Sequence, residues 1–203
     1  MTRAAGTIRR RMAVADRRAA LLQIGLDLFA DQTPDEVRVE DVARAAGVST
    51  GLLYNYFGSK REFHVAVVAA AYEQLRAATE PDPLLPSDER LRASLTGFLE
   101  HVRDNATGWA WLLRGAPGSD AELVSLGDAM RQTVIDRVLT DLPAQDVTPA
   151  ARVAVRGWIG YIEACAVAWL SRPELRQDQV LELMVATLHA ALHAALTAVP
   201  EET

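Results

Sequence analysis

The fold of this chain is decided by residues 39–60, which read VEDVARAAGVSTGLLYNYFGSK. The first eight of them, residues 39–46, place small apolar side chains on one face of a short helix. Gly47 follows where the chain must turn, because glycine adopts positive φ without steric cost. Ser49 then begins a second helix, since its hydroxyl can accept from the free N–H groups of the first turn. Two short helices joined by a tight turn are typical of a helix-turn-helix.

The second helix of this motif carries residue types that suit DNA. Thr50 and Gly51 lie at its N-terminal end, which in a helix-turn-helix meets base edges in the major groove. Tyr54, Tyr56 and Lys60 follow, and their hydroxyl and ammonium groups suit phosphate oxygens. We therefore expect Thr50 and Gly51 to read the base sequence and the three later residues to fix the register on the duplex.

Residues 1–18 form a basic arm that holds six arginines and one aspartate. The arm has too few apolar residues to fold alone, so it either becomes ordered on DNA or is only a solubilising tail. We predict DNA contacts from this arm and from the motif at the following positions: Arg9, Arg10, Arg11, Arg38, Val39, Ser49, Thr50, Gly51, Leu52, Tyr54, Asn55, Tyr56 and Lys60.

The stretch VARAAGVSTGLLYNYFGSKREF, residues 42–63, resembles the DNA-binding signature of the TetR family of bacterial transcriptional regulators. The upstream segment LLQIGLDLFA, residues 21–30, is similar to the first helix of that family. Two positions depart from the pattern: Thr33-Pro34 stands where the family has Gly and an aromatic residue, and Arg38 stands where a Thr or Ser caps the second helix. The resemblance implies a homodimer that binds a pseudo-palindromic double-stranded operator and responds to a small ligand, more often as a repressor than as an activator.

Composition supports a DNA-binding end joined to a different body. Residues 1–61 hold ten Lys and Arg against seven Asp and Glu, and residues 62–203 hold eleven against twenty, so the two parts carry +3 and −9 of the net −6. A basic end beside an acidic body directs a polyanion to one face, since local potential governs phosphate binding. The single cysteine, Cys165, excludes an intrachain disulfide and suits a reducing cytoplasm.

Beyond the motif, every segment has helical periodicity and none alternates as a strand does, which predicts an all-α fold. Ser59 should cap a long helix that begins at Lys60, and Ser87 should cap the next one after a proline-rich loop. Thr148 followed by a proline predicts another helix start. We divide the chain into a basic arm, a helix-turn-helix domain, a connecting helix and a ligand-binding and dimerisation domain, which cover residues 1–18, 13–60, 60–80 and 81–203.

The last two helices indicate a dimer. The helix that opens after Thr148 carries a stripe of small residues, and the final one, about residues 177–198, is apolar nearly all round. A second subunit would cover these faces, although packing within the chain is the alternative. The predicted interface residues are Gly157, Gly160, Ala164, Ala168, Leu181, Met184, Leu188 and Leu192.

Large rings among small residues predict an apolar pocket in the C-terminal part. Its predicted lining is Phe98, His101, Val102, Trp109, Trp111, Leu112, Tyr161 and Glu163. Trp109 and Trp111 point about 200° apart on a helix, so only one of them faces the pocket. Glu163 lies in an apolar run and meets a ligand, an arginine across the dimer, or water. The acidic surroundings favour a neutral or cationic lipophilic effector.

Other functions are disfavoured. No paired carboxylate, phosphate loop or nucleophile–base set suggests an enzyme, and no cofactor is expected. His189 and His193 are spaced for one metal but have no third ligand nearby in sequence, so we predict no metal site. The uncharged residues 183–199 are too few for a membrane span and are expected to form a packing helix. The sequence thus predicts a cytoplasmic ligand-responsive regulator, with an activator or a regulator without a ligand as the alternatives.

Overall fold

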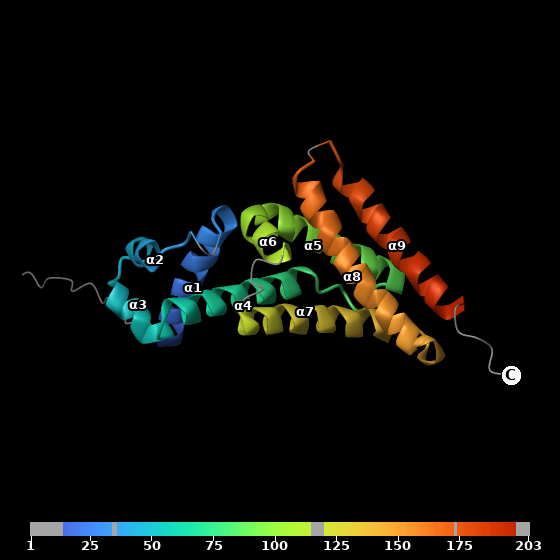
Figure 1. Cartoon of the computed structure of the whole chain (residues 1–203), viewed down its shortest axis with the longest axis horizontal. Helices are drawn as coiled ribbons and strands as arrows, with labels where there is room; N and C mark the ends of the chain where they lie inside the picture. Colours follow the sequence, from blue (N-terminus) through green and yellow to red (C-terminus); the bar gives the residue numbers. More distant parts are fainter. Residues whose placement is uncertain (1–13, 34–35, 115–119, 173, 198–203) are drawn as a thin grey trace, which may run out of the picture.

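The computed structural model describes residues 14–33, 36–114, 120–172 and 174–197. These parts of the chain contain helices and no strand, so the all-α prediction is confirmed (Figure 1). In chain order the elements are α1 (Val14–Asp31), α2 (Val39–Ala45), α3 (Thr50–Phe57), α4 (Lys60–Ala78), α5 (Ser87–Asp104), α6 (Ala106–Leu113), α7 (Ala121–Thr140), the short 3-10 helix η2 (Ala144–Asp146), α8 (Pro149–Leu170) and α9 (Gln177–Thr197).

Helices α1, α2 and α3 form one end of the molecule, where they pack with the start of α4 (Figure 1). The turn between α2 and α3 is as predicted: Gly47 has φ 64°, and the N–H of Val48 donates to the carbonyl of Ala43 at 2.9 Å. Ser49 caps α3, because its hydroxyl accepts from the N–H of Leu52 at 3.2 Å. These contacts close the last turn of one helix and open the next within four residues.

A second glycine turn separates α3 from α4. Gly58 has φ 76° and its N–H donates to the carbonyl of Tyr54 at 2.7 Å, which ends α3. The hydroxyl of Ser59 then accepts from the N–H of Glu62 at 3.1 Å and caps α4, as predicted. Lys60 therefore stands at the first position of a helix that leaves the helix-turn-helix.

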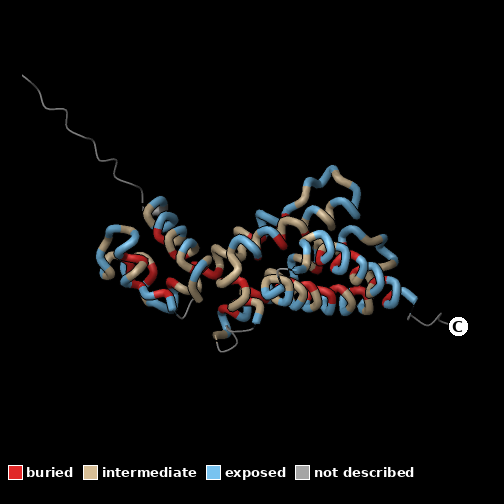
Figure 2. Tube along the Cα trace, turned by 90° about the horizontal axis from the view of Figure 1, so that it is seen from above, coloured by how far each residue is buried: buried red, intermediate tan, exposed pale blue. Residues whose placement is uncertain are grey.

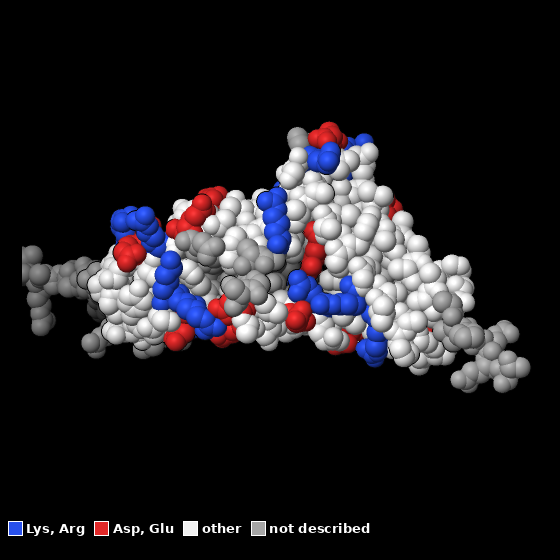
Figure 3. Space-filling view, viewed as in Figure 1, with Lys and Arg blue, Asp and Glu red and all other residues white. Residues whose placement is uncertain are grey.

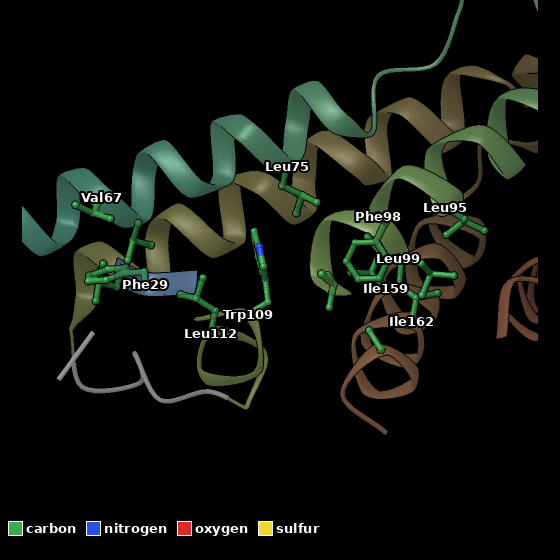
Figure 4. Packing of buried hydrophobic residues seen from close by; sticks show 14 of the residues in the cluster. Phe29, Val67, Leu75, Leu95, Phe98, Leu99, Trp109, Leu112, Ile159 and Ile162 are labelled. Atoms are coloured by element: carbon green, nitrogen blue, oxygen red, sulfur yellow. The ribbon is translucent and has the colours of Figure 1, made fainter. Parts of the chain in front are cut away.

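Helix α4 is shared between the two ends of the protein (Figure 1). Its buried side chains, Phe63, Val67 and Leu75, belong to one hydrophobic cluster with Phe29 of α1 and Trp109 of α6. Figure 4 shows Val67 and Leu75 on α4 together with Phe29 and Trp109, and Figure 2 shows buried residues along the length of the molecule. The core is therefore continuous from the helix-turn-helix into the C-terminal bundle.

Two glycines allow helices to approach one another at backbone distance. A Cβ on Gly97 of α5 would lie 2.1 Å from the carbonyl oxygen of Ala78, and a Cβ on Gly108 of α6 would lie 2.5 Å from that of Phe29. Any side chain would force the backbones apart. The end of α4 is thus set against α5, and α1 against α6.

The C-terminal helices α8 and α9 form the most extensive helix pair, and α5 and α7 flank them (Figure 1). The indole N–H of Trp158 donates to the carbonyl of Met184 at 2.8 Å inside this pair. The predicted Thr148 cap is confirmed, because its hydroxyl accepts from the N–H of Ala151 at 3.1 Å. The predicted Ser87 cap is wrong: Ser87 is the first residue of α5, Pro86 holds the cap position, and no side chain caps this helix.

Thr148→Ala should lower the free energy of unfolding by about 1 kcal/mol, because it removes the side-chain acceptor that caps α8. Ser87→Ala is the matched control and should change it by less than about 0.5 kcal/mol, since Ser87 makes no such bond. Urea denaturation at one fixed protein concentration measures both. An equal loss in the two variants would contradict the capping geometry.

Candidate nucleic-acid interface and internal cavity

The outer face of α3 is the candidate DNA-reading surface. Gly51, Tyr54 and Asn55 lie at i, i+3 and i+4 on this helix and are exposed, with Tyr54 at 37%. Thr50 is half-buried at the first position. The oxygen of the Ser49 hydroxyl accepts the cap hydrogen bond and fixes the start of α3, while its O–H can still donate to another group. The face toward solvent therefore carries one small residue and two polar ones within about one turn.

The remaining predicted DNA residues occupy several environments. Arg38, before α2, and Lys60, at the start of α4, are exposed. Leu52 and Tyr56 are half-buried, and Tyr56 packs against the core. Val39 is only 1% exposed, so the structure corrects its assignment as a DNA contact: it is a core residue of the helix-turn-helix.

The basic arm lies mostly outside the described residues, and so do Arg9, Arg10 and Arg11. Arg18 is described, and it belongs to α1: its guanidinium stacks over the ring of Phe57 at 4.9 Å from the ring centroid. This cation–π contact places a positive charge beside the last residue of α3. The sequence gave no sign of this contact, because Arg18 is one of several arginines near the N-terminal end of the chain. Figure 3 shows that cationic side chains at the α1–α4 end are interspersed with acidic ones.

A cavity of about 630 Å³ lies inside the C-terminal bundle, a size within the range of small-molecule sites. Side chains from α4 to α9 line it, and most of them are apolar. Figure 4 shows Leu75 from α4, Trp109 from α6 and Phe98 from α5 converging in this region. Trp109 is 3% exposed, and its ring meets Tyr72 and His101 edge-on, each at 5.6 Å between centroids.

The predicted pocket residues divide into those that line this cavity and those that do not. The lining includes Phe98, Trp109 and Glu163. His101 and Leu112 instead border a much smaller recess that shares Trp109. The other three are elsewhere: Val102, Trp111 and Tyr161 are absent from both linings, and Val102 is fully buried core. Trp109 is thus the tryptophan that faces the cavity, as the helical geometry required of one of the pair.

Glu163 meets an arginine of its own chain. The Nε of Arg131 lies 2.8 Å from Glu163 Oε1, and Nη2 lies 3.4 Å from Oε2. Arg131 also donates to Asp128 at 3.2 Å. Nearby, burial raises the pKa of the Tyr72 phenol above its ordinary value. Sequence spacing could not reveal this pair, because its partners are 32 residues apart on α7 and α8.

Ion pairs also surround the other end of the cavity. Arg137 donates to the carbonyl of Thr79 at 2.8 Å and to Glu80 at 3.0 Å, and Arg90 pairs with Asp141. The carboxylates of Glu80 and Asp141 therefore balance the positive charges of Arg137 and Arg90 in the cavity lining.

The outer faces of α8 and α9 are apolar and open. Gly157, Gly160, Ala164 and Ala168 are exposed, and a Cβ on either glycine would meet no atom within 4 Å. By length and composition α8 and α9 could each cross a membrane, which is weak evidence because core helices of soluble proteins pass the same test.

Part of the predicted interface is corrected. Met184, Leu188 and Leu192 are 0%, 3% and 9% exposed within the chain, so they pack its interior and are not available to another subunit, while Leu181 is half-buried. Exposed apolar side chains that the sequence analysis did not select lie at Val153, Leu183 and Leu196, with 73%, 53% and 36% exposure.

No group of three or more potential metal ligands occurs among the described residues. His189 lies 3.6 Å from Asp88 of α5, and His193 is exposed further along α9.

The sequence matches two family models. Residues 21–67 match the model described as "Bacterial regulatory proteins, tetR family", and residues 87–191 match "Tetracyclin repressor-like, C-terminal domain". Together they cover the helix-turn-helix with the start of α4 and most of the cavity-forming bundle.

Relatives of known name include regulators of both signs. The HTH-type transcriptional repressor KstR of Rhodococcus jostii is 28% identical over 180 residues, which is 85% of this chain and 82% of that protein. The HTH-type transcriptional activator FasR of Mycolicibacterium smegmatis is 26% identical over 175 residues, 82% of this chain and 78% of that protein.

Solved structures share the architecture over nearly the whole chain. A tetR-family transcriptional regulator from Streptomyces coelicolor has a TM-score of 0.78 at 29% identity and covers 94% of this chain and 93% of its own. A putative TetR-family regulator from Rhodococcus sp. has a TM-score of 0.74 at 22% identity, with 88% and 99% covered, and supports the fold alone.

Lys60→Ala should weaken binding to all DNA sequences about equally and reduce the slope of log K against log salt by about 0.9, because it removes one phosphate contact. Thr50→Ala should instead change which base is preferred near the start of α3. Binding to a library of operator variants at several salt concentrations separates the two effects. Arg76→Ala, which removes an exposed cation further along α4, is the control. Equal loss of sequence preference in both variants would contradict the assignment.

Proposed function

Because the chain belongs to the TetR family of bacterial transcriptional regulators, we propose that it is a homodimer whose operator binding is controlled by a small molecule in the α4–α9 cavity. One observation carries this proposal. Helix α4 begins at Lys60, beside the candidate recognition helix, and its later residues Tyr72 and Leu75 line the cavity. A molecule in the cavity therefore touches the same helix that positions the DNA-binding end.

In this proposal the DNA contacts come from α3 and its neighbours. Thr50, Gly51, Tyr54 and Asn55 face base edges and sugar-phosphate, and Lys60 with Arg38 face phosphate. The exposure of Gly51, Tyr54, Asn55 and the two cations supports this arrangement. Residues 60–80 act as the connecting helix, and residues 81–203 hold the effector and the subunit interface. The protein would act in the cytoplasm, where its operator is found.

A second connection between the two ends supports control through α4. Arg61, next to Lys60, donates through Nε and Nη2 to both carboxylate oxygens of Asp120, each at 2.7 Å, and its Nη1 lies 3.0 Å from Glu122. Asp120 also caps α7 by accepting from the N–H of Glu122 at 3.0 Å. Helix α7 lines the cavity through Gly127, among others. A shift of α7 around a ligand would therefore pull on the first turn of α4.

The homodimer is supported by the open apolar faces of α8 and α9. The stripe through Gly157, Gly160, Ala164 and Ala168 of α8 is exposed, as are Val153 of α8 and Leu183 of α9, and no described residue lies against the two glycines. Two copies of this helix pair would form a four-helix interface. Two recognition helices at a fixed separation would then match a pseudo-palindromic operator.

The sign of regulation is proposed as repression, released by the ligand. The resemblance to the family and the similarity to KstR support this choice, while the similarity to FasR keeps activation as the second candidate. A reporter driven by the operator in cells with and without the gene separates them. Higher reporter output without the gene indicates a repressor, and lower output indicates an activator.

Ala164→Arg should convert the dimer to a monomer and weaken operator binding by more than about tenfold, because one half-site offers too few contacts for tight binding. The long cation would stand in the small-residue stripe with no partner. Light scattering measures the mass and titration with operator DNA measures the affinity. Ala129→Arg, at an exposed position of α7, is the control and should remain dimeric. A dimeric Ala164→Arg protein would move the interface elsewhere.

Arg61→Met should alter operator affinity and speed hydrogen exchange in the first turn of α7, because it cuts the tie between α4 and α7. Asp120→Asn keeps a helix-capping residue but loses the ion pair, and it lies on the other helix. The double variant should show no further change if the tie is responsible, since residues in one network are not additive.

A direct phosphate contact by Arg61 gives a different result: its effect would add to that of Asp120→Asn. Arg76→Met removes an α4 cation that pairs only with Glu73 and Glu80, at 3.0 and 3.8 Å, and should change neither measurement.

A further inference from the structure

The cavity has a polar end that is built from three helices. Tyr72 of α4, Arg131 of α7 and Glu163 of α8 all line it. A Cβ on Gly127 would lie 3.1 Å from the Tyr72 hydroxyl oxygen and 3.3 Å from Arg131 Nη1. The hydroxyl and the guanidinium therefore approach one point in space, and the missing side chain at Gly127 leaves that point free.

This end of the cavity is rich in donors that have no acceptor. Among the hydrogen bonds between described residues, Arg131 uses three N–H groups, two toward Glu163 and one toward Asp128. A guanidinium has five N–H groups, so two are left. The Tyr72 hydroxyl makes no hydrogen bond with any side chain or backbone group that the structure describes. The residue is half-buried and lines the cavity. Unused donors beside an apolar cavity favour a ligand that brings an acceptor.

The charges of the lining disfavour an anionic acceptor. Three arginines line the cavity, at positions 90, 131 and 137, against four carboxylates, at positions 80, 88, 141 and 163. Each of these arginines is paired: Arg90 with Asp141, Arg131 with Glu163 and Arg137 with Glu80. No cation remains to compensate a carboxylate or phosphate that enters the apolar space, and an uncompensated buried charge is costly.

Apart from the ion pairs of Arg90 and Arg137, the rest of the lining is mostly apolar and aromatic. Trp109 stands edge-on to Tyr72, and Phe98, Leu95 and Ile159 add apolar wall from α5 and α8. Figure 4 shows Phe98, Leu95 and Ile159 grouped together to the right of Trp109. An elongated apolar ligand would pack against this wall, with one polar group at the end of the cavity that Tyr72 and Arg131 form.

We propose that the effector is a neutral lipophilic molecule with a single hydrogen-bond acceptor, such as a ketone or ester carbonyl, that accepts from the Tyr72 hydroxyl and a free N–H of Arg131. The proposal rests on the proposed function, since it names the ligand class of the same cavity. It also assigns Tyr72 as the contact between ligand and α4. Through Tyr72 the bound molecule contacts α4, the connecting helix, and through Arg131 the same molecule contacts α7.

A series of probes with one chain length and different head groups tests this assignment. Dodecan-2-one, dodecanoate and dodecylammonium are titrated below their solubility limits into the full-length dimer, with calorimetry and tryptophan emission as readouts. Dodecan-2-one should bind at least about tenfold more tightly than dodecanoate, because the carboxylate would be buried without a cation. Equal or tighter binding of dodecanoate, equal or tighter binding of dodecylammonium, or no binding of dodecan-2-one would each overturn the proposal.

Tyr72→Phe tests the named contact without changing the shape of the ring. It should weaken dodecan-2-one binding about 3- to 10-fold, the usual effect of losing one neutral hydrogen bond. Tyr161→Phe is the matched control: it removes a hydroxyl from a tyrosine outside the cavity lining and should leave the affinity unchanged. Unchanged binding in Tyr72→Phe would overturn the assignment of Tyr72.

Operator binding is measured on the same samples and separates the two proposals. Dodecan-2-one that binds through Tyr72 but leaves operator affinity unchanged would support the ligand class and refute ligand control of DNA binding. Operator binding by a protein that takes up no dodecan-2-one would refute the ligand class and leave the DNA-binding role intact.

Discussion

The burial of one face of α4 along its whole length is the constraint on which the rest of this structure depends. Phe63 and Val67 are 0% exposed near its start, and Leu75 is 5% exposed near its end. Each buried side chain of this size contributes about 1.5–3 kcal/mol relative to an exposed one, so neither half of the helix can leave its neighbours cheaply. A change in packing at one end must therefore move the helix as a unit or bend it, and α4 contains no proline or glycine at which a bend would be easy.

The contacts around α4 determine in which direction such a movement is possible. Gly97 and Gly108 hold α5 and α6 against the backbone of Ala78 and of Phe29, with no side chain between them to yield. On the other side, the contact with α7 at Arg61 is an ion pair at the surface, with the arginine 55% exposed. Close-packed backbones resist displacement, whereas an exposed ion pair can be re-formed at little cost. The joint between α4 and α5 at Ala78 therefore resists displacement more than the ion pair between Arg61 and Asp120 does.

Local sequence chemistry was enough to predict much of the fold. The helix starts at Ser49, Ser59 and Thr148 were predicted correctly, because each cap depends only on a hydroxyl and an N–H two or three residues away. Ser87 was assigned wrongly by the same rule: Pro86 adopts the extended backbone of the cap position, and the serine falls inside the helix. Asp120 caps α7 by the same local rule but was not assigned, and its ion pair with Arg61 could not be predicted because the two residues are 59 positions apart.

The site was predicted less well than the fold, since its geometry depends on which face each helix buries. Trp109 and Glu163, which the sequence analysis selected, line the cavity, whereas Tyr72 and Arg131 were missed because they belong to helices that carried no pocket signal in sequence. Val39 was assigned to DNA, although its side chain is needed in the small core of the helix-turn-helix.

The face of α8 shows a conflict between local and tertiary preference. Gly157 and Gly160 lie inside a helix, where each costs about 1 kcal/mol relative to alanine, and neither has a neighbour in the chain that an alanine would touch. Gly97 and Gly108 differ, because the backbone contacts that they permit offset this cost. Helix α8 thus keeps two unfavourable residues on an open face, next to Val153 at 73% exposure, and no described residue packs against those glycines. A second helix at close distance is the arrangement in which both glycines become favourable, since the missing Cβ atoms then allow backbone approach, as they do between α6 and α1. The same physical rule that joins α1 to α6 inside one protomer would hold two copies of the chain together at the outer face of α8 in the proposed homodimer.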